Sequence, residues 1–172
     1  MGRRFPGRAS ALRFLAAGAL ALGLPGAGAW GAETTTATVV LVHSGDSLVV
    51  EVAQGVRITV HLLGIAAPSL RDVRPRGDSK PAGQPLAQEA KKALEDLVLS
   101  KEVRVSLYGR DMFRQVMAEV HLGRENVNVH MVRGGLARVD RAGRRVPEGL
   151  RHTLDQAEAE ARRERRGLWM FE

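Results

Sequence analysis

The chain has 172 residues and carries 26 Lys and Arg against 19 Asp and Glu, for a net charge of +7, with no cysteine. Its length suits one domain, and 44% apolar with 26% charged residues excludes a collagen-like or intrinsically disordered composition. The missing cysteines exclude disulfides, zinc–thiolate and iron–sulfur sites, and a thiol nucleophile.

The N-terminal segment has the pattern of an export signal. Four arginines precede or border an apolar run over residues 14–24, and small residues follow at 27–29. This order is typical of a secretory signal peptide over 1–29, with a cut as late as residue 32 as the alternative. The run is shorter than the ~20 apolar residues that a bilayer span needs, which disfavours an uncleaved anchor. We therefore expect a secreted or periplasmic protein, with no stable membrane insertion after cleavage.

Removal of this segment changes the charge balance. Residues 1–32 hold four of the 26 basic side chains and no acid, so 22 basic and 19 acidic side chains remain, a net charge of +3. Mean basicity is then weak evidence for a polyanion partner, and only local clusters of basic side chains can support one.

The chain that follows begins with a predicted run of strands. Apolar and β-branched residues separated by turn signals at Gly45 and Gly55 predict strands over 37–42, 48–52 and 56–65. Residues 66–83 contain three prolines and are expected to form a loop. Apolar residues at helical spacing then predict a helix over 86–99.

The second half of the chain predicts two more strands and two more helices. We expect strands over 102–107 and 116–122, a short helix over 127–133, extended chain over 136–139 and a helix over 147–166. The order of these elements indicates a small mixed α+β domain with a β-barrel core.

Several segments, taken in order, resemble the thermonuclease family, the staphylococcal-nuclease-like domains. His43-Ser44-Gly45-Asp46-Ser47 resembles the family's Asp-Gly-Asp-Thr turn, and residues 60–69 resemble its Arg-Leu-x-Gly-Ile-Asp-Ala-Pro-Glu segment. The most specific match is Asn126-Val127-Asn128 with residues 132–137. The resemblance implies an OB-fold-like five-stranded barrel with three helices, in one thermonuclease-like domain over 37–171.

The resemblance also implies a chemistry. Active members of this family hydrolyse phosphodiesters with Ca²⁺, which two carboxylates and a backbone carbonyl hold. A glutamate orients or activates water, and two arginines bind the phosphate and stabilise the charge of the transition state.

This sequence departs from that pattern at most of the positions concerned. Asp46 matches the first metal-binding aspartate. The second metal-binding aspartate falls on Ala66, and the residue that supplies the backbone carbonyl falls on Ala67. The glutamate falls on Ser69. The first arginine falls on His61, and the second falls on Gln115. The resemblance therefore predicts a vestigial active-site pocket with no functional catalytic residue. We expect no cofactor, or Ca²⁺ bound through Asp46 if the family activity persists.

Other side chains offer substitutes for the missing ones. Arg57 shares a predicted strand face with His61, and Arg114 precedes Gln115. A basic cluster with few acids nearby adds further candidate phosphate-binding residues, namely Arg138, Arg141, Arg144 and Arg145.

Each of these residues also has a structural interpretation. Asp46 is equally well explained as a turn residue held by local hydrogen bonds. His43, Asp46 and His61 could together bind a transition metal, but ligand counts favour an ordinary turn histidine and an ordinary strand histidine. Asn126 and Asn128 are expected to cap or pin a helix. The arginines that close the last helix are expected to be balanced by glutamates on the same helix.

Three functions are compatible with these observations. The first is an exported, catalytically degenerate thermonuclease-like protein that binds nucleic acid or another partner through its basic clusters. The second is an active metal-dependent phosphodiesterase that hydrolyses DNA or RNA with a rearranged site. The third is an envelope barrel that binds other proteins; the sequence identifies no particular protein partner.

Overall fold

The computed structural model of the chain describes residues 33–70, 85–110, 114–142 and 146–170. The predicted signal peptide and two candidate residues, Arg144 and Arg145, lie outside these ranges. Within them, no helix is both long enough and apolar enough to cross a bilayer.

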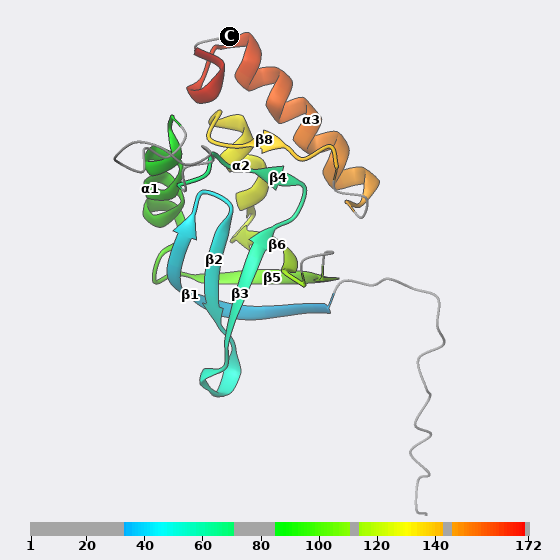
Figure 1. Cartoon of the computed structure of the whole chain (residues 1–172). Coiled ribbons are helices and arrows are strands. Elements are labelled where there is room, and N and C mark those ends of the chain that lie inside the picture. The colour runs from blue at the N-terminus through cyan, green and yellow to red at the C-terminus, as the bar shows by residue number, and fades with distance from the viewer. Residues whose placement is uncertain (1–32, 71–84, 111–113, 143–145, 171–172) are drawn as a thin grey trace, which may run out of the picture.

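Five strands form a closed barrel (Figure 1). They are β1 (Glu33–Ser44), β2 (Ser47–Glu51), β3 (Arg57–Leu62), β5 (Glu102–Arg110) and β6 (Val116–Leu122). Strand β1 pairs antiparallel with β2 and β5, β2 with β3, and β5 with β6. A parallel pairing of β3 with β6 closes the barrel, which confirms the predicted fold class.

Three helices and several short elements complete the described part of the chain. The helices are α1 (Ala87–Val98), α2 (Val127–Arg133) and α3 (Glu148–Arg163). The short strands are β4 (Ile65–Ala66), β7 (Glu125–Asn126) and β8 (Arg138–Val139), and the 3-10 turns are η1 (Ala53–Gly55) and η2 (Gly167–Met170). In Figure 1, α3 lies across the end of the molecule that carries α2 and β8.

Two predicted elements end earlier than the sequence pattern indicates. The strand predicted over 56–65 stops at Leu62, because Gly64 turns the chain with a φ of +79° and Ile65 then pairs with β8. The helix predicted over 147–166 stops at Arg163, and Arg165 and Gly167 both take a φ of +51° beyond it. Positive φ cannot continue a right-handed helix.

The hydrophobic core fills the barrel and the space beneath the helices. Alternate strand residues point inward, so that the barrel contributes Val39, Leu48, Val50, Val60 and Leu62 among its fully buried side chains. The helices add Leu94, Met131 and Leu154, each from the apolar face of its helix. This single core joins the barrel to all three helices.

A buried asparagine fixes α2 on the barrel. Asn128 is fully buried, and its Oδ1 accepts a hydrogen bond from the backbone N–H of Val120 at 3.1 Å. Its Nδ2 donates to the carbonyls of Leu63 and Ala118 at 3.0 and 3.2 Å. Asn126 caps the same helix by accepting a hydrogen bond from the N–H of Val129. Both asparagines therefore pin or cap α2, as expected.

The turn after α2 lies against the C-terminal end of α3. Gly135 has a φ of +67°, and a Cβ placed there would lie 2.1 Å from the carbonyl oxygen of Arg166. The N–H of Leu168 donates to the carbonyl of Gly135 at 2.8 Å. Only glycine fits this approach, because any side chain would both strain the backbone and displace the segment after α3.

Replacing Gly135 by alanine should therefore destabilise the protein. We expect the Gly135→Ala variant to lose roughly 2–4 kcal/mol, from left-handed strain and from overpacking against the backbone of Arg166. Gly134→Ala is the matched control, since Gly134 has a φ of −72° and its Cβ would meet the flexible side chain of Leu136 at 3.3 Å and the carbonyl oxygen of His130 at an ordinary contact distance of 3.5 Å. Urea unfolding measures both, and equal midpoints for the two variants would contradict the close approach.

Candidate functional site

The turn between β1 and β2 is held by the side chain that matches the family's metal-binding aspartate. Asp46 is half-buried, and its Oδ1 accepts a hydrogen bond from the Ser44 hydroxyl at 2.6 Å. Its Oδ2 accepts one from the backbone N–H of Ala67 at 2.9 Å, and its carbonyl accepts one from the N–H of Leu62 at 2.8 Å. Both carboxylate oxygens thus already have donors from the protein.

Small residues allow this turn to pack closely against its neighbours. A Cβ placed on Gly45 would lie 2.7 Å from the Cβ of Ala90 on α1 and 2.8 Å from the Cβ of Ala67. Ala66, where the family has its second metal-binding aspartate, is exposed and pairs with Arg138 in the β4–β8 ladder. The structure therefore brings Asp46, Ala66 and Ala67 together, as the sequence predicts, but with one carboxylate among them.

The remaining positions of the vestigial pocket lie around the same end of the barrel. His61 is half-buried; it pairs with Ser47, the residue after Asp46, and with Met117 on β6. Gln115 is exposed and directly precedes Val116, at the start of β6. Ser69 is half-buried, two residues beyond Ala67. We refer to Asp46, His61, Ala66, Ala67, Ser69 and Gln115 as the vestigial site.

Arg57 does not reach this site. It pairs with Glu51 at the other end of the β2–β3 hairpin, and its Nε lies 2.8 Å from a Glu51 carboxylate oxygen. His61 lies four residues further along β3, which corresponds to about 13 Å. The shared strand face predicted from sequence therefore does not make Arg57 a substitute for the missing cation at His61.

Residues 111–115 resemble the family's Asp-x-Tyr-Gly-Arg motif, and Arg114 occupies the position of its glycine. It has a φ of +62°, a conformation that favours glycine, and its carbonyl accepts a hydrogen bond from Arg110 Nη1 at 2.9 Å.

Arg141, from the basic cluster, is engaged by acids of α3. Its guanidinium donates to Asp155 at 3.1 Å and to Glu158 at 2.8 Å, and these interactions, with Glu158 first, raise the pKa of Arg141 further above its usual value. Glu158 is only 4% exposed and also accepts the N–H of Val139 at 2.9 Å. Arg141 therefore neutralises a buried carboxylate that ties α3 to β8.

Arg138 and Arg162 both stack on the last tryptophan. Their guanidinium carbons lie 4.3 and 3.9 Å from the centroid of the Trp169 ring, which is 3% exposed. Trp169 thus packs the end of the chain onto the domain, whereas the residue Arg138 itself is exposed beside Ala66. Two of the four arginines at the end of α3, Arg162 and Arg166, form the predicted ion pairs with glutamates of that helix or with the glutamate that follows it.

The side chains present do not fit the calcium site that the family implies. Ca²⁺ takes six to eight oxygen ligands, and this pocket offers one carboxylate whose oxygens already accept hydrogen bonds. Nor do the described ranges contain any group of three or more His, Asp or Glu arranged to hold a metal ion, so His43, Asp46 and His61 do not form one.

Sequence reasoning missed the role of Glu158. The charge pattern makes Glu158 one of the glutamates that balance the arginines of α3, yet it lies on the buried face of that helix, four residues after Leu154 and three before Ala161. A carboxylate within an apolar stripe at helical spacing is a signal for a buried ion pair.

Comparisons with known proteins agree with this geometry. Residues 59–171 match the model of the staphylococcal nuclease homologues. The chain is 32% identical over 105 residues to a Haemophilus influenzae protein named "Uncharacterized endonuclease", covering 61% of this chain and 52% of that protein. It is 34% identical over 120 residues to a Coccidioides posadasii protein named "Probable endonuclease LCL3", and this alignment covers 65% of this chain and 37% of that protein. The aligned regions thus span about half or less of these curated relatives.

If Asp46 holds the turn, removing its carboxylate should destabilise the metal-free protein. We expect Asp46→Ala to cost roughly 1–3 kcal/mol, because it leaves the N–H of Ala67 and the Ser44 hydroxyl without their acceptor. Asp96→Ala is the control, since Asp96 makes an exposed ion pair with Lys92 that solvent screens and that should contribute little to stability. Denaturant unfolding in EDTA measures both, and an Asp46→Ala protein as stable as wild type would contradict the structural role.

Proposed function

The chain belongs to the staphylococcal nuclease homologue family, and we propose that it is an exported, catalytically degenerate member that binds nucleic acid without cleaving it. One observation carries the proposal: the carboxylate of Asp46 is used by the protein itself, through the Ser44 hydroxyl and the N–H of Ala67. The one carboxylate of the family's metal site that this sequence keeps therefore serves the fold.

The loss of catalysis follows from what phosphodiester hydrolysis requires. Positioned positive charge stabilises the transition state, and removing one such donor costs about 10²–10³ in rate. Here histidine and glutamine occupy the two arginine positions, at His61 and Gln115, and Ser69 occupies the position of the glutamate. Such losses are not additive, but together they remove the metal, the base and the phosphate clamp.

Nucleic acid is the ligand class that the family suggests, as substrate or partner. Arg138 supports binding at the vestigial site, because it is exposed directly across from Ala66 and its guanidinium is positioned by Trp169. Arg141 contributes less, since Asp155 and Glu158 already pair with it. We therefore expect weak binding that depends on few phosphate contacts.

Export is proposed from the sequence of residues 1–32, with its arginines, short apolar run and small residues. The destination is then the periplasm or the medium.

An active endonuclease is the second candidate. The printed names of the two relatives favour it, since both contain the word endonuclease. Such an enzyme would need a phosphate clamp and a water-activating group different from those of the family pattern.

A nuclease assay separates these two functions. We expect purified protein without the N-terminal 32 residues to show no cleavage of single- or double-stranded DNA or of RNA with Ca²⁺, Mg²⁺, Mn²⁺ or Zn²⁺, because the clamp and the base are replaced. Metal-dependent cleavage that Asp46→Ala abolishes, while Asp96→Ala retains it, would contradict degeneracy.

A salt titration tests nucleic-acid binding. We expect the affinity for single-stranded DNA to fall as salt rises, and Arg138→Gln to lower the slope of log K against log salt by about 0.7, the value of one phosphate contact. Arg104→Gln on β5 is the control, because it removes the same charge at an exposed position outside the vestigial site. Absence of binding at low salt would favour a protein-binding barrel, and equal slopes for both variants would exclude Arg138.

A further inference from the structure

Four arginines lie within five residues at the C-terminal end of α3, namely Arg162, Arg163, Arg165 and Arg166. The first two belong to the last turn of the helix, where cations interact favourably with the unpaired helix carbonyls. Arg165 lies beyond the last helical residue, so this interaction does not account for it. The helix dipole therefore explains only part of the cluster.

The glutamates of this region already pair with other arginines. Each of three glutamates accepts an arginine from α2, from the segment after β8 or from α3 and its end; the glutamates are Glu158, Glu160 and Glu164, and the arginines are Arg133, Arg141, Arg162 and Arg166. In the described part of the chain, Arg163 and Arg165 form no ion pair. Both residues are exposed, so their charges face solvent.

Arg165 occupies a backbone position that favours glycine. The N–H of Arg166 donates to the carbonyl of Ala161 at 2.9 Å, and the N–H of Arg165 donates to that of Arg162 at 3.1 Å. These two bonds form a Schellman motif, in which Arg165 is the residue with positive φ, here +51°. A side chain at such a position strains the backbone. Strain at an exposed arginine points to a use for its side chain.

The cluster is continuous with the arginine that borders the vestigial site. The guanidinium carbons of Arg138 and Arg162 lie 4.3 and 3.9 Å from the same point, the centroid of the Trp169 ring. The two carbons are therefore no further apart than the sum of these distances, 8.2 Å. Arg138 is exposed and pairs with Ala66 in the β4–β8 ladder. Positive charge thus extends from the vestigial site, past Trp169, to the end of α3.

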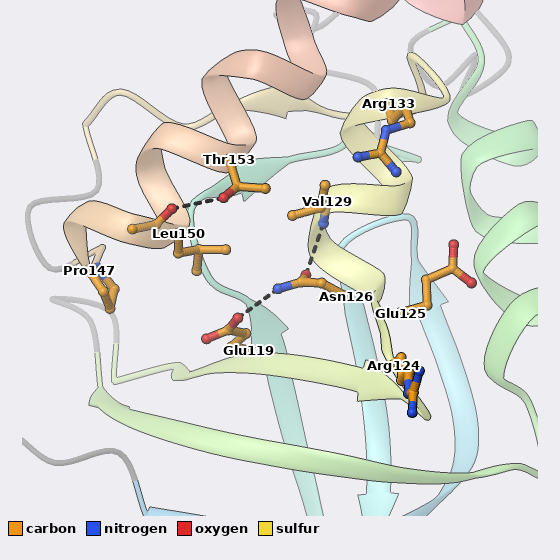
Figure 2. A pocket seen from close by; sticks show the side chains of 10 residues that line it. Glu119, Arg124, Glu125, Asn126, Val129, Arg133, Pro147, Leu150 and Thr153 are labelled. Atoms are coloured by element: carbon orange, nitrogen blue, oxygen red, sulfur yellow. Dashed lines mark hydrogen bonds between the residues drawn. The ribbon is translucent and has the colours of Figure 1, made fainter.

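The cavity nearby offers no comparable surface. It has a volume of about 430 Å³ and lies between the β6–β7 hairpin, α2 and the start of α3 (Figure 2). Its charged lining residues are two arginines and two glutamates, namely Arg124, Arg133, Glu119 and Glu125. Their charges cancel, so a polyanion is disfavoured there.

We propose that the phosphate backbone of a nucleic acid lies along Arg138, Arg162, Arg163 and Arg165, from the vestigial site to the C-terminal end of α3. This inference rests on the proposed function, because it names the surface that the nucleic acid covers. A polymer with one charge per nucleotide matches a row of separate cations, whereas a single phosphate cannot contact all of them. Trp169 is only 3% exposed and cannot stack on bases, so the contacts are to phosphates and binding is independent of sequence.

An anionic bilayer is the other large polyanion that arginines attract. Bilayer binding also needs apolar side chains that insert between the lipids. Among the described residues, Met170 is the one large exposed apolar side chain at this end of the molecule. The other three, Leu41, Val56 and Leu99, belong to β1, the β2–β3 connection and the end of α1. Nucleic acid is therefore the favoured partner.

Salt titration of the purified protein with a single-stranded oligothymidylate of about 12 nucleotides, a length within the range of one OB-fold site, tests the surface. Each lost phosphate contact lowers the slope of log K against log salt by about 0.7. The double variant Arg163→Gln, Arg165→Gly should lower it by about 1.4 and thus lose about sevenfold less affinity than wild type between 50 and 200 mM salt. Arg104→Gln, which removes one exposed charge on β5, should keep the wild-type slope.

The outcomes separate this surface from the proposed function. A double variant with the wild-type slope, beside an Arg138→Gln protein with a lowered one, would overturn the surface at the end of α3 and leave nucleic-acid binding standing. Wild-type protein that does not bind at low salt would overturn both. Loss of binding to anionic phospholipid vesicles in the double variant, with an unchanged DNA slope, would assign the surface to a membrane instead.

Arg165→Gly alone separates the lost charge from damage to the fold. Because glycine suits positive φ, this variant should unfold at a higher urea concentration than wild type, yet its salt slope should fall by about 0.7. Ser100→Gly is the matched control, since Ser100 is exposed, uncharged and has a φ of +61°. It should gain stability and keep the wild-type slope. A stabilised Arg165→Gly protein with the wild-type slope would refute the role of Arg165.

Discussion

The carboxylate of Asp46 joins two segments that lie 21 residues apart, the β1–β2 turn and the chain that leaves β4. Through its bond to the N–H of Ala67 it positions β4, which pairs with β8. In β8 the N–H of Val139 donates to the buried carboxylate of Glu158, which ties β8 to α3. A continuous series of polar contacts therefore runs from the barrel turn to the C-terminal helix, and it begins at Asp46.

The chain has the fold of the family, but most side chains at the vestigial site differ from the family pattern. A calcium site needs six to eight oxygen ligands, whereas Asp46 is the one carboxylate of the vestigial site, and both of its oxygens accept hydrogen bonds from the protein. Ala66 replaces the family's second metal-binding aspartate and supplies no side-chain ligand. Ser69 replaces the family's glutamate and supplies no carboxylate to act as a base. Membership of a nuclease family therefore does not by itself establish nuclease activity, which depends on the residues at the site.

The sequence was sufficient for the elements and the barrel, because strand alternation, helical spacing and turn residues are local signals. It also assigned Asp46 and Ala67 to one pocket, and these two residues lie in contact in the structure. Its errors depend on tertiary placement. Gly64 diverts the chain from β3 to β4, and Glu51 engages Arg57 at the far end of a hairpin.

The cavity of about 430 Å³ between β6, β7, α2 and α3 could not be predicted, because these four elements together supply its walls. Glu119, Arg133 and Leu150 come from β6, α2 and α3, and no spacing in the sequence relates them. The ion pairs of Arg141 were equally hidden, since its partners Asp155 and Glu158 lie on a separate helix. From the sequence alone Arg141 is a candidate phosphate-binding cation. In the fold its guanidinium pairs with two acids of α3.

The most direct test of this account is the effect of Ca²⁺ on the thermal unfolding of the wild-type protein and of Asp46→Ala. A ligand that binds only the folded state raises the melting temperature as its concentration increases. If Asp46 serves the fold, Asp46→Ala melts lower in EDTA and Ca²⁺ shifts neither protein. A melting temperature of the wild type that rises with Ca²⁺, with no rise in Asp46→Ala, would show that the carboxylate still binds the metal and would contradict the account.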